Sequence, residues 1–376
     1  MKFVVSSTDL LGHLQAVSRV ISSKNTLPIL DNFLFKLDGN ELEITASDLE
    51  STLITKMTLE NTSDNGSIAV PARILTDTLK EFPEQPLTFE IDLDKLSVVI
   101  NSENGKFTVV GQHAGDFPQM IAIKQDQKAT VEVPSEVLYN GINKTLFATA
   151  DDELRPVMNG IFIELASDSL TFVASDAHKL VRYKRMDAQA DADSSFILPK
   201  KPASLLKNVL PKEEHPVTVE FDDKNAFFSM TEYRLVCRLV EGNYPSYNSV
   251  IPTENPNKLS IDRVAFFNTL KRVSVYSNQA SNLVKLALTG NQITVSAQDI
   301  DFSISAYERL NCQYEGEDME IGFKSTFLIE ILSNLSSPDI VVELSDPTRA
   351  GIMVPSVSEN ESEDLLMLLM PMMINA

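Results

Sequence analysis

The chain has 376 residues, and Asp and Glu outnumber Lys and Arg by 53 to 32, which gives a formal net charge of −21. This length predicts several domains instead of one core, and a hydrophobic fraction of 43% supplies enough apolar side chains to fill them. The strong negative charge argues against a simple basic DNA-binding protein, and two cysteines 75 positions apart argue against a disulfide framework or a CxxC zinc site.

The hydropathy pattern bears on the cellular compartment. The first residues lack the long apolar segment of a signal peptide, and the longest apolar run, 365–374, has ten residues. Ten residues are too few to span a bilayer. Together with the two cysteines, these features predict a cytoplasmic protein without a membrane segment.

The predicted elements of the first part of the chain form two similar sets. A strand at 2–6 precedes a helix whose apolar residues recur with the spacing of one buried stripe, and a hairpin is predicted around Asp38-Gly39. A second strand and a helix beginning near Pro71 repeat this order. The strand-like runs that follow the two helices are 33–37 and 41–45, then 87–93, 96–100 and 106–111.

The same pattern recurs along the whole chain. Three similar segments end on Asp48, Asp176 and Asp299, which are 128 and 123 residues apart. A second marker follows each of them at a matching offset, over 68–73, 196–201 and 319–324. A third closes the first two units, at 115–118 and 242–245. Repeats of this length are whole domains, because solenoid units are much shorter.

These markers predict three similar domains, over 1–121, 129–250 and 257–376, with linkers at 122–128 and 251–257. Each domain is expected to contain a strand–helix–three-strand unit twice, so that the chain contains six. Helices that cover one side of antiparallel sheets give an α+β fold.

Positive charge is concentrated in the predicted helices, which cover 8–23, 71–82, 135–150, 199–210, 260–277 and 323–335. These helices carry eleven basic and six acidic residues, whereas the rest of the chain carries 21 and 47. Any single lysine on a helix surface has an ordinary explanation, since exposed charge is the default. A basic helix layer in an acidic chain nevertheless favours non-specific, mobile contact with the phosphates of a duplex that it surrounds, without reading of bases.

Eight short motifs occur along the chain, and in order they are Met1-Lys2-Phe3, Thr26-Leu27-Pro28-Ile29-Leu30, Asp48-Leu49-Glu50, Val70-Pro71-Ala72-Arg73, Asn159-Gly160, the segment 174–180, Glu320-Ile321-Gly322-Phe323 and Met370-Pro371-Met372. In these motifs, and over its whole length, the sequence resembles the bacterial DNA polymerase III beta subunits, the family of sliding clamps. The resemblance implies a head-to-tail homodimeric ring of DNA-clamp domains, with helices lining the hole and sheets outside. It implies no catalytic activity, cofactor or metal.

The resemblance also implies partners. These are duplex DNA, the alpha subunit of DNA polymerase III and other proteins with a clamp-binding motif, and an ATP-dependent clamp loader. The family's DNA-facing basic positions fall on Lys24, Arg73, Lys80, Lys200 and Lys201. Another DNA-contacting position of the family falls near Asp152, where an acidic side chain is unsuited to a phosphate.

The family's peptide-binding pocket lies between the second and third domains and accepts a short motif with apolar anchors. Its lining falls on Met158, Ser175, Ala177, His178, Lys179, Leu180, Pro245, Val250, Leu368, Leu369, Met370, Pro371 and Met372. Methionine and leucine provide an adaptable apolar surface for several partners. The run 365–370 could equally be a buried final strand, and both interpretations hold if alternate residues face core and groove. Ser249, where the family often has arginine, and the tail beyond Met372 depart from the usual pattern.

The dimer contact of the family falls on Phe107 and Val109, on a predicted edge strand, and on Val275 and Tyr276, at a helix end. An apolar edge strand is an aggregation hazard when it is free, and pairing across a closed interface removes that edge.

Two other classes of function are alternatives to a sliding clamp. A three-domain scaffold that binds peptides but never DNA would share the fold and the pocket, and the basic helix layer favours the clamp over it. An enzyme would need a phosphate loop, a metal cluster or a nucleophile elbow, which the sequence lacks. His178 lies beside Asp176, but the aspartate recurs in the other repeats without a histidine, so a role in a turn is expected.

Overall fold

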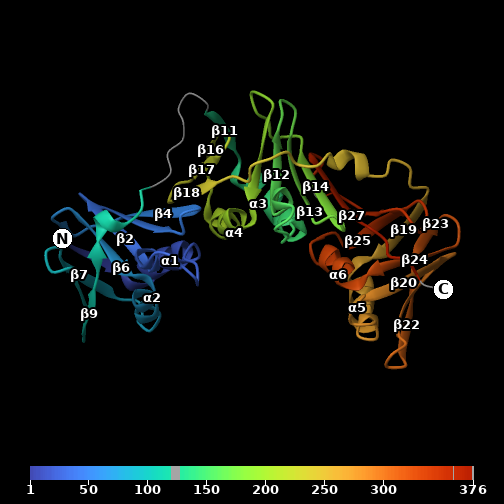
Figure 1. Ribbon diagram of the computed structural model, residues 1–376, viewed down its shortest axis with the longest axis horizontal. Helices are drawn as coiled ribbons and strands as arrows, with labels where there is room; N and C mark the ends of the chain where they lie inside the picture. Colours follow the sequence, from blue (N-terminus) through green and yellow to red (C-terminus); the bar gives the residue numbers. More distant parts are fainter. Residues whose placement is uncertain (120–127, 359, 375–376) are drawn as a thin grey trace. The chain divides into compact units, whose positions relative to one another are not determined.

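The computed structural model describes residues 1–119, 128–358 and 360–374. In these residues one strand, one helix and three strands follow each other twice in each of three similar domains (Figure 1), which confirms the predicted α+β fold. Each predicted helix is present but shorter than expected, because residues at its ends belong to strands, turns or short 3-10 helices. The α-helices are α1 (Ser7–Ser18), α2 (Ala72–Lys80), α3 (Ser135–Thr145), α4 (Lys200–Val209), α5 (Arg263–Ser274) and α6 (Ser325–Ser333).

Two helix ends show why the predicted bounds were too wide. After α1, the amides of Val20 and Ile21 donate to carbonyls three residues back, at 3.1 and 3.0 Å, so the chain tightens into a turn before residue 23. Before α5, the Asp262 carboxylate accepts the Ala265 amide at 2.6 Å and caps the helix. Residues 260–262, predicted as helix, are therefore the end of a strand.

The first of two compact units comprises residues 1–139 and 201–239. Its described residues form a five-stranded sheet, ordered β5-β1-β7-β8-β9, and a nine-stranded sheet, ordered β10-β6-β2-β3-β4-β18-β17-β16-β11. The strands are β1 (Lys2–Ser6), β2 (Asn32–Asp38), β3 (Glu41–Ser47), β4 (Ser51–Thr58), β5 (Thr62–Ser63), β6 (Gly66–Pro71), β7 (Pro86–Asp92), β8 (Ser97–Asn101), β9 (Lys106–Val110), β10 (Gln112–His113), β11 (Ala129–Val133), β16 (Val217–Phe221), β17 (Asn225–Ser229) and β18 (Tyr233–Arg238).

The second unit comprises residues 140–200 and 240–376. Where the structure describes it, the unit has a nine-stranded sheet, ordered β15-β12-β13-β14-β27-β26-β25-β19-β23, and a four-stranded sheet, ordered β22-β21-β20-β24. The strands are β12 (Gly160–Leu165), β13 (Leu170–Ser175), β14 (Lys179–Arg185), β15 (Ser194–Pro199), β19 (Asn257–Asp262), β20 (Leu283–Thr289), β21 (Gln292–Asp299), β22 (Ile304–Asn311), β23 (Gln313–Glu315), β24 (Met319–Lys324), β25 (Asp339–Leu344), β26 (Gly351–Pro355) and β27 (Glu363–Leu369).

Each nine-stranded sheet combines strands from two consecutive repeats. In the first unit β4 pairs with β18, with Ser51 opposite Cys237, and in the second β14 pairs with β27, with Lys179 opposite Leu369. The compact units therefore do not coincide with the three predicted domains. Most of the predicted linker 122–128 lies outside the described residues, and 251–256 carry no helix or strand.

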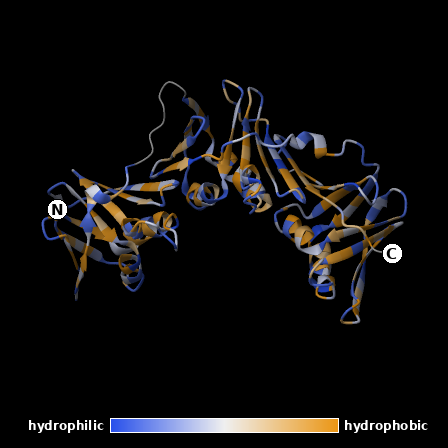
Figure 2. Cartoon of the chain, in the orientation of Figure 1, coloured by the Kyte–Doolittle hydropathy of each residue, from blue (hydrophilic) through white to orange (hydrophobic). Residues whose placement is uncertain are grey.

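The hydrophobic cores lie between the helices and the sheets. In the first unit α1 packs beside α2, and in the second α5 packs beside α6 (Figure 1). The strands alternate between buried and exposed residues, as in Leu87, Phe89 and Ile91 of β7. Fully buried Phe3 stacks on Phe89 with ring centroids 4.8 Å apart. Figure 2 shows the apolar residues on the strands and helices that form these cores.

The repeated aspartates have the structural role that the sequence predicts. One carboxylate oxygen of Asp48 accepts the amides of Glu50 and Ser51 at 3.1 and 2.7 Å. Asp176 accepts two amides of its own turn, at 2.9 and 2.8 Å, and Asp299 does so at 2.9 and 3.3 Å. Each aspartate thus closes the turn into the last strand of its strand–helix–three-strand unit.

His13 of α1 lies against the pairing of β4 with β18. Its Nδ1 is 2.6 Å from the Thr55 hydroxyl, and its ring stacks on Tyr233 with centroids 5.8 Å apart. Burial lowers the pKa of His13 below its ordinary value of 6.5. Protonation therefore costs more in the folded protein than in the unfolded chain.

This difference predicts acid sensitivity of the first unit. Because the folded pKa is the lower one, the His13 contribution to stability is complete above about pH 6.5 and is lost progressively as the pH falls below it. The variant His13→Gln cannot titrate, so its denaturation midpoint should depend less on pH than that of the wild type, between about pH 5 and 7.5. Parallel pH profiles for the two proteins would contradict the assignment.

Candidate functional site

Two of the predicted DNA-facing residues line one groove. The groove lies between the end of α1 and the helix α2 and has a volume of about 620 Å³. Arg73 and Lys80 flank Asp77, whose oxygens lie 3.8 Å from Arg73 Nε and 3.0 Å from Lys80 Nζ. The Arg73 side chain is 94% exposed, so its pairing with Asp77 is weak and its guanidinium can bind a phosphate.

The other three predicted DNA contacts differ in their surroundings. Lys24 is exposed in the segment that follows α1. Lys200 forms an ion pair of 2.6 Å with Asp151, a surface residue whose side chain is 83% exposed. Lys201 donates to the carbonyl oxygen of Val20 at 2.6 Å and forms an ion pair with Asp48. Four of the five cations thus have a carboxylate nearby, which weakens the attraction to phosphates and suits mobile contact.

The predicted peptide-binding site is assembled on the pairing of β14 with β27. Leu180 lies opposite Leu368, and beyond the strand the Met370 amide donates to the carbonyl of His178 at 2.8 Å. The tail then reaches β24, where the Met372 amide donates to the Gly322 carbonyl at 2.8 Å. A Cβ at Gly322 would lie 2.8 Å from the Met372 oxygen, so this approach requires glycine.

Alternate residues of β27 face opposite sides, as one interpretation of the sequence requires. Leu368 belongs to a small apolar cluster with Leu180 and Tyr247. Leu369 is fully buried in the core cluster on the other side, with Met367. The expectation that Leu369 lines the pocket is therefore corrected, because the two-residue period of a strand turns it away from Leu368.

The remaining predicted pocket residues fall into three groups. Met158 and Ser175 are buried, and the Ser175 hydroxyl donates to the Lys179 carbonyl at 2.9 Å. Pro371 and Met372 are half-buried. The exposed members, which a ligand could contact directly, are Ala177, His178, Pro245, Val250 and Met370.

Helix α6 contributes residues that sequence reasoning missed. The Phe327 ring stacks on His178 with centroids 5.8 Å apart, and the ammonium groups of Lys179 and Lys324 lie 4.4 and 4.7 Å from its centroid. Lys179 is 5% exposed and forms ion pairs with Asp176 at 2.8 Å and with Glu330 at 3.0 Å. Lys324 ends a repeated marker and could have drawn attention to this helix, but no local pattern connects Phe327 with His178.

The predicted dimer residues lie on an edge strand and after a helix. Phe107 and Val109 are on β9, the last strand of the five-stranded sheet, and Phe107 is 39% exposed. Val275 and Tyr276 follow α5 and are 73% and 42% exposed. Both pairs thus include large apolar side chains that are exposed in the single chain.

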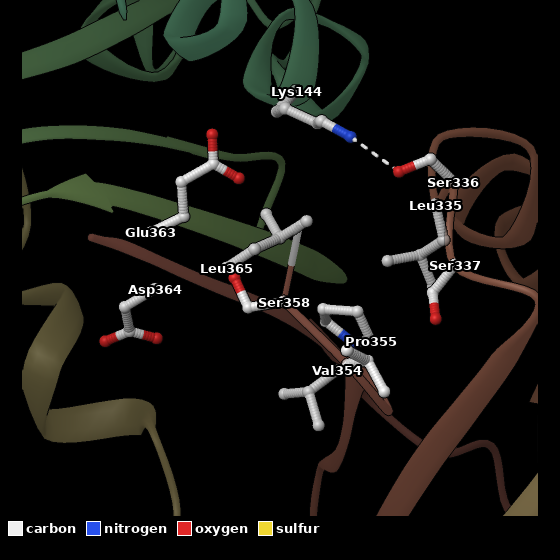
Figure 3. A pocket seen from close by; sticks show the side chains of 11 residues that line it. Lys144, Leu335, Ser336, Ser337, Val354, Pro355, Ser358, Glu363, Asp364 and Leu365 are labelled. Carbon is white, nitrogen blue, oxygen red and sulfur yellow. Dashed lines mark hydrogen bonds between the residues drawn. The ribbon is translucent and has the colours of Figure 1, made fainter. Parts of the chain in front are cut away.

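A further cavity of about 300 Å³ lies at the start of β27 (Figure 3). The tail residues of the predicted peptide site follow the other end of this strand. Lys144 Nζ reaches across the cavity to the Ser336 hydroxyl at 3.5 Å, and Glu363 and Asp364 lie at its rim. None of its lining residues belongs to the predicted DNA, peptide or dimer sites.

The part of the chain that the structure describes contains neither a membrane-spanning helix nor a cluster of metal-ligating side chains. Within 1–119, 128–358 and 360–374, no helix combines the length and apolar character needed to cross a membrane. The same ranges contain no group of three or more His, Cys, Asp or Glu side chains placed to hold a metal ion.

Comparison with known proteins gives one consistent result. Models for the DNA polymerase III beta subunit match its N-terminal domain at residues 1–121, its central domain at 132–246 and its C-terminal domain at 248–373. The chain is 29% identical to the beta sliding clamp of Vibrio cholerae, with 98% of this chain and 99% of that protein covered. It is 30% identical to the beta sliding clamp of a Synechocystis species, over 94% and 96%.

Solved structures agree with the sequence comparisons. The DNA polymerase III subunit beta of Pseudomonas aeruginosa superposes with a TM-score of 0.91 at 26% identity, and all of both chains is covered. A sliding clamp from Bartonella birtlesii superposes with a TM-score of 0.91 at 28% identity, again over the whole of both chains. The chain therefore belongs to the DNA polymerase III beta subunit family, the bacterial beta sliding clamps.

Proposed function

We propose that this sliding clamp of DNA polymerase III closes into a head-to-tail dimer around duplex DNA in the cytoplasm. Like its family, it is a processivity factor and not an enzyme. Domains over 1–121, 129–250 and 257–376 from two copies would give a ring of six. An ATP-dependent clamp loader would open the ring, and the alpha subunit of polymerase III and other proteins with a clamp-binding motif would dock on it.

The sheet topology is the main observation that supports the proposed dimer. In the part of the chain that the structure describes, two sheets have nine strands, whereas the others have five and four. The five-stranded sheet ends on β9 and the four-stranded sheet ends on β22. Pairing of β9 with β22 of a second copy would complete another nine-stranded sheet and remove both open edges. A second pairing related by symmetry would close the ring.

The exposure of equivalent residues supports this pairing. Phe107 of β9 lies opposite Ile100, as Leu235 of β18 lies opposite Phe228 in the next repeat. Leu235 is fully buried because β4 adjoins its strand, but Phe107 is 39% exposed. Tyr276 follows α5 by two residues, as Val20 follows α1, and these residues are 42% and 0% exposed.

The register of the missing pair follows from the two junctions within the chain. At each junction, the residue that lies opposite the turn aspartate pairs with a residue of the neighbouring repeat. Ser51 pairs with Cys237, and Lys179 pairs with Leu369. Each of these partners lies two positions after the buried residue that corresponds to Phe107. Ile304 of β22 holds the position of Ser51 and Lys179, since it lies opposite Asp299. The repeat therefore places Ile304 opposite Val109 of a second copy.

The basic residues support non-specific contact with DNA. Lys24, Arg73, Lys80 and Lys200 lie in or beside helices, are at least partly exposed, and carry no base-reading signature. Their number is small, and the formal charge of the whole chain is −21. Retention on DNA would then come mainly from encirclement, and direct phosphate contacts would add a salt-sensitive attraction.

Encirclement can be tested through the topology of the DNA. The protein is loaded onto a nicked circular duplex with a bacterial clamp loader and ATP, and free protein is removed by gel filtration. We expect co-elution with the circle and release when a restriction enzyme linearises it. Retention that survives linearisation would contradict encirclement, and failure to load at all would favour the peptide-binding scaffold.

We further propose that partner peptides bind where Leu180, Leu368, Tyr247 and the tail come together. Tyr244 stacks on Phe162 beside this cluster, with centroids 4.8 Å apart, so aromatic rings form part of the wall. His178 and Met370 offer exposed surface at its edge. Apolar anchors of a linear motif would bury against these side chains, with about 25 cal/mol gained for each Å² of apolar surface.

A truncation tests this pocket without removing the core. A stop after Leu369 leaves β27 in its sheet but deletes the tail that reaches Gly322. A stop after Asp364 would instead remove the buried centre of β27 and is not informative. We expect the affinity for a synthetic clamp-binding peptide of the polymerase alpha subunit to fall by at least about tenfold, measured by fluorescence anisotropy. Unchanged affinity would refute the pocket, and an unchanged dimer mass is the control.

A further inference from the structure

We propose that Lys201 is a positioning residue that anchors the β3–β4 turn beside the junction of β4 with β18, and that it does not contact DNA phosphates. The inference goes beyond the proposed function, because it depends on contacts inside one compact unit and not on the dimer. It also removes one residue from the DNA-facing set that the family resemblance implies.

The ammonium group of Lys201 is already engaged by two partners. It donates to the Val20 carbonyl, after α1, at 2.6 Å, and it forms a hydrogen-bonded ion pair with the second carboxylate oxygen of Asp48. The Asp48 side chain is only 12% exposed, whereas that of Lys201 is 40% exposed. A phosphate that recruited Lys201 would leave a largely buried carboxylate without its cation, which is costly.

The turn that Lys201 anchors sets the start of β4. The first oxygen of Asp48 accepts the amides of Glu50 and Ser51, and Ser51 is the residue opposite Cys237 at the junction. Between Asp48 and Glu50, Leu49 has a φ of 79°, a left-handed conformation that is strained for a residue with a Cβ. The hydrogen bonds of Asp48 hold this conformation, and Lys201 fixes the carboxylate that makes them.

Comparison of the repeats shows why a distant lysine is needed here. In the second repeat, the second oxygen of Asp176 is bound at 2.8 Å by Lys179, three residues along the same turn. The equivalent position in the first repeat is Ser51, which carries no cation. In the third repeat an amide, Asn278, takes this role for Asp299 at 3.4 Å. Lys201 of α4 thus supplies the cation that the second repeat obtains from within its own turn.

The adjacent Lys200 provides a matched control. Its partner Asp151 lies on the surface with an 83% exposed side chain, and Lys200 itself is 43% exposed. A surface ion pair of this kind contributes little, so a phosphate can displace Asp151. Two neighbouring lysines of similar exposure therefore have different expected roles.

The experiment compares Lys201→Met, Asp48→Asn and Lys200→Met in the full-length protein. Hydrogen exchange of the β4 and β18 amides, read by mass spectrometry, should be about three- to tenfold faster in the first two variants and unchanged in Lys200→Met. Asp48→Asn keeps an oxygen for the turn amides, so it should fold even if Lys201→Met does not. The double variant Lys201→Met/Asp48→Asn should exchange no faster than either of these single variants. Lys201→Arg keeps the cation, so its β4 and β18 amides should exchange as slowly as those of the wild type.

A second readout separates positioning from DNA contact. The affinity for a labelled linear duplex is measured over a series of salt concentrations. Loss of one phosphate contact lowers the slope of log affinity against log salt by about 0.9, which we expect for Lys200→Met and not for Lys201→Met.

Either readout can overturn the proposed role of Lys201. A reduced slope in Lys201→Met, or unchanged exchange in both Lys201→Met and Asp48→Asn, would overturn the proposal. If the wild type does not bind the duplex, the proposed DNA contacts fail, while the exchange measurement still decides the role of Lys201.

Discussion

Replacing Phe107 with aspartate is expected to lower the mass of the protein in solution from twice the chain mass to the chain mass of 41.7 kDa. Phe107 lies on the open edge strand β9, and its ring packs edge-on against Phe82 with centroids 5.2 Å apart. A carboxylate at this position would be buried without a cation when β9 pairs with β22, and such burial costs several kcal/mol. Light scattering coupled to gel filtration measures the mass.

Leu154 supplies the control for this experiment. It is 91% exposed but lies in a loop that belongs to neither edge strand. Leu154→Asp removes a similar apolar side chain and adds the same charge, so it should leave the dimer intact. A dimeric Phe107→Asp protein, or a monomeric wild type, would contradict the proposed ring.

A cysteine pair tests the register as well as the existence of the contact. The known junctions show that residues such as Ser51 and Cys237 are not hydrogen-bonded to each other, since the bond of Arg238 N to Glu50 O belongs to the neighbouring pair. Such pairs bring their Cα atoms to about 4.5 Å, within the range for a disulfide. Val109→Cys combined with Ile304→Cys should therefore form covalent dimers on oxidation. More efficient crosslinking with cysteine at Ser305 would show a different register.

Replacing Arg185 with methionine is expected to open the β14–β27 junction, with the amides of the two strands exchanging roughly a hundredfold faster or more. Arg185 is 4% exposed, and its guanidinium binds Asp187 at 2.8 and 2.9 Å and Glu363 at 3.3 Å. Tyr183, also buried, donates its hydroxyl to Glu363 at 2.6 Å. Removal of Arg185 leaves Glu363, whose side chain is 19% exposed, without its cation, and a buried charge left unpaired costs about 3 kcal/mol. The Asp187 side chain is 40% exposed, so solvent screens its pair with Arg185 and that pair adds little.

The same contacts shift the pKa values of Asp187 and Tyr183. The Arg185 guanidinium holds the pKa of the Asp187 carboxyl below its usual range. Burial, and the hydrogen bond to Glu363, raise the pKa of Tyr183, so that its hydroxyl keeps the proton that it donates. For Asp187, stability is present above the unfolded pKa near 3.8 and is lost as the pH falls through the lower folded value.

Arg182 on the same strand is the matched control. It forms an ion pair of 2.7 Å with Asp364 of β27, but the two side chains are 23% and 44% exposed. Solvent screens this pair, so Arg182→Met should change the exchange of the junction by less than about fivefold. Similar effects of the two arginine variants would show that burial of Arg185 is not the cause.

Local sequence patterns were sufficient to predict the repeated architecture. The apolar stripe of α1, the alternation in β7 and the threefold recurrence of Asp48, Asp176 and Asp299 each reflect contacts within a few residues or across one turn. Periodicity records which side of an element is buried, and a turn aspartate binds amides only two or three positions away. The predicted helices extended too far, because the caps and tight turns that end a helix leave its apolar pattern unchanged.

Other features depend on residues far apart in the chain. The core position of Leu369 required knowledge of the strand register, and the contact of Phe327 with His178 joins an α-helix to a turn about 150 residues earlier. The same holds for Lys201 and Asp48, which no spacing rule connects. A lysine that is exposed to solvent and a lysine that binds a carboxylate of another repeat cannot be distinguished in a sequence.

The amino-acid sequence by itself determined the six strand–helix–three-strand units, their α+β character and the family to which the chain belongs. The tertiary structure alone decided which strands pair between repeats, which edges stay open, and which cations are engaged. The physical reason is that a pattern along the chain shows that a face or an edge must be covered. Only the folded arrangement determines which residue covers it.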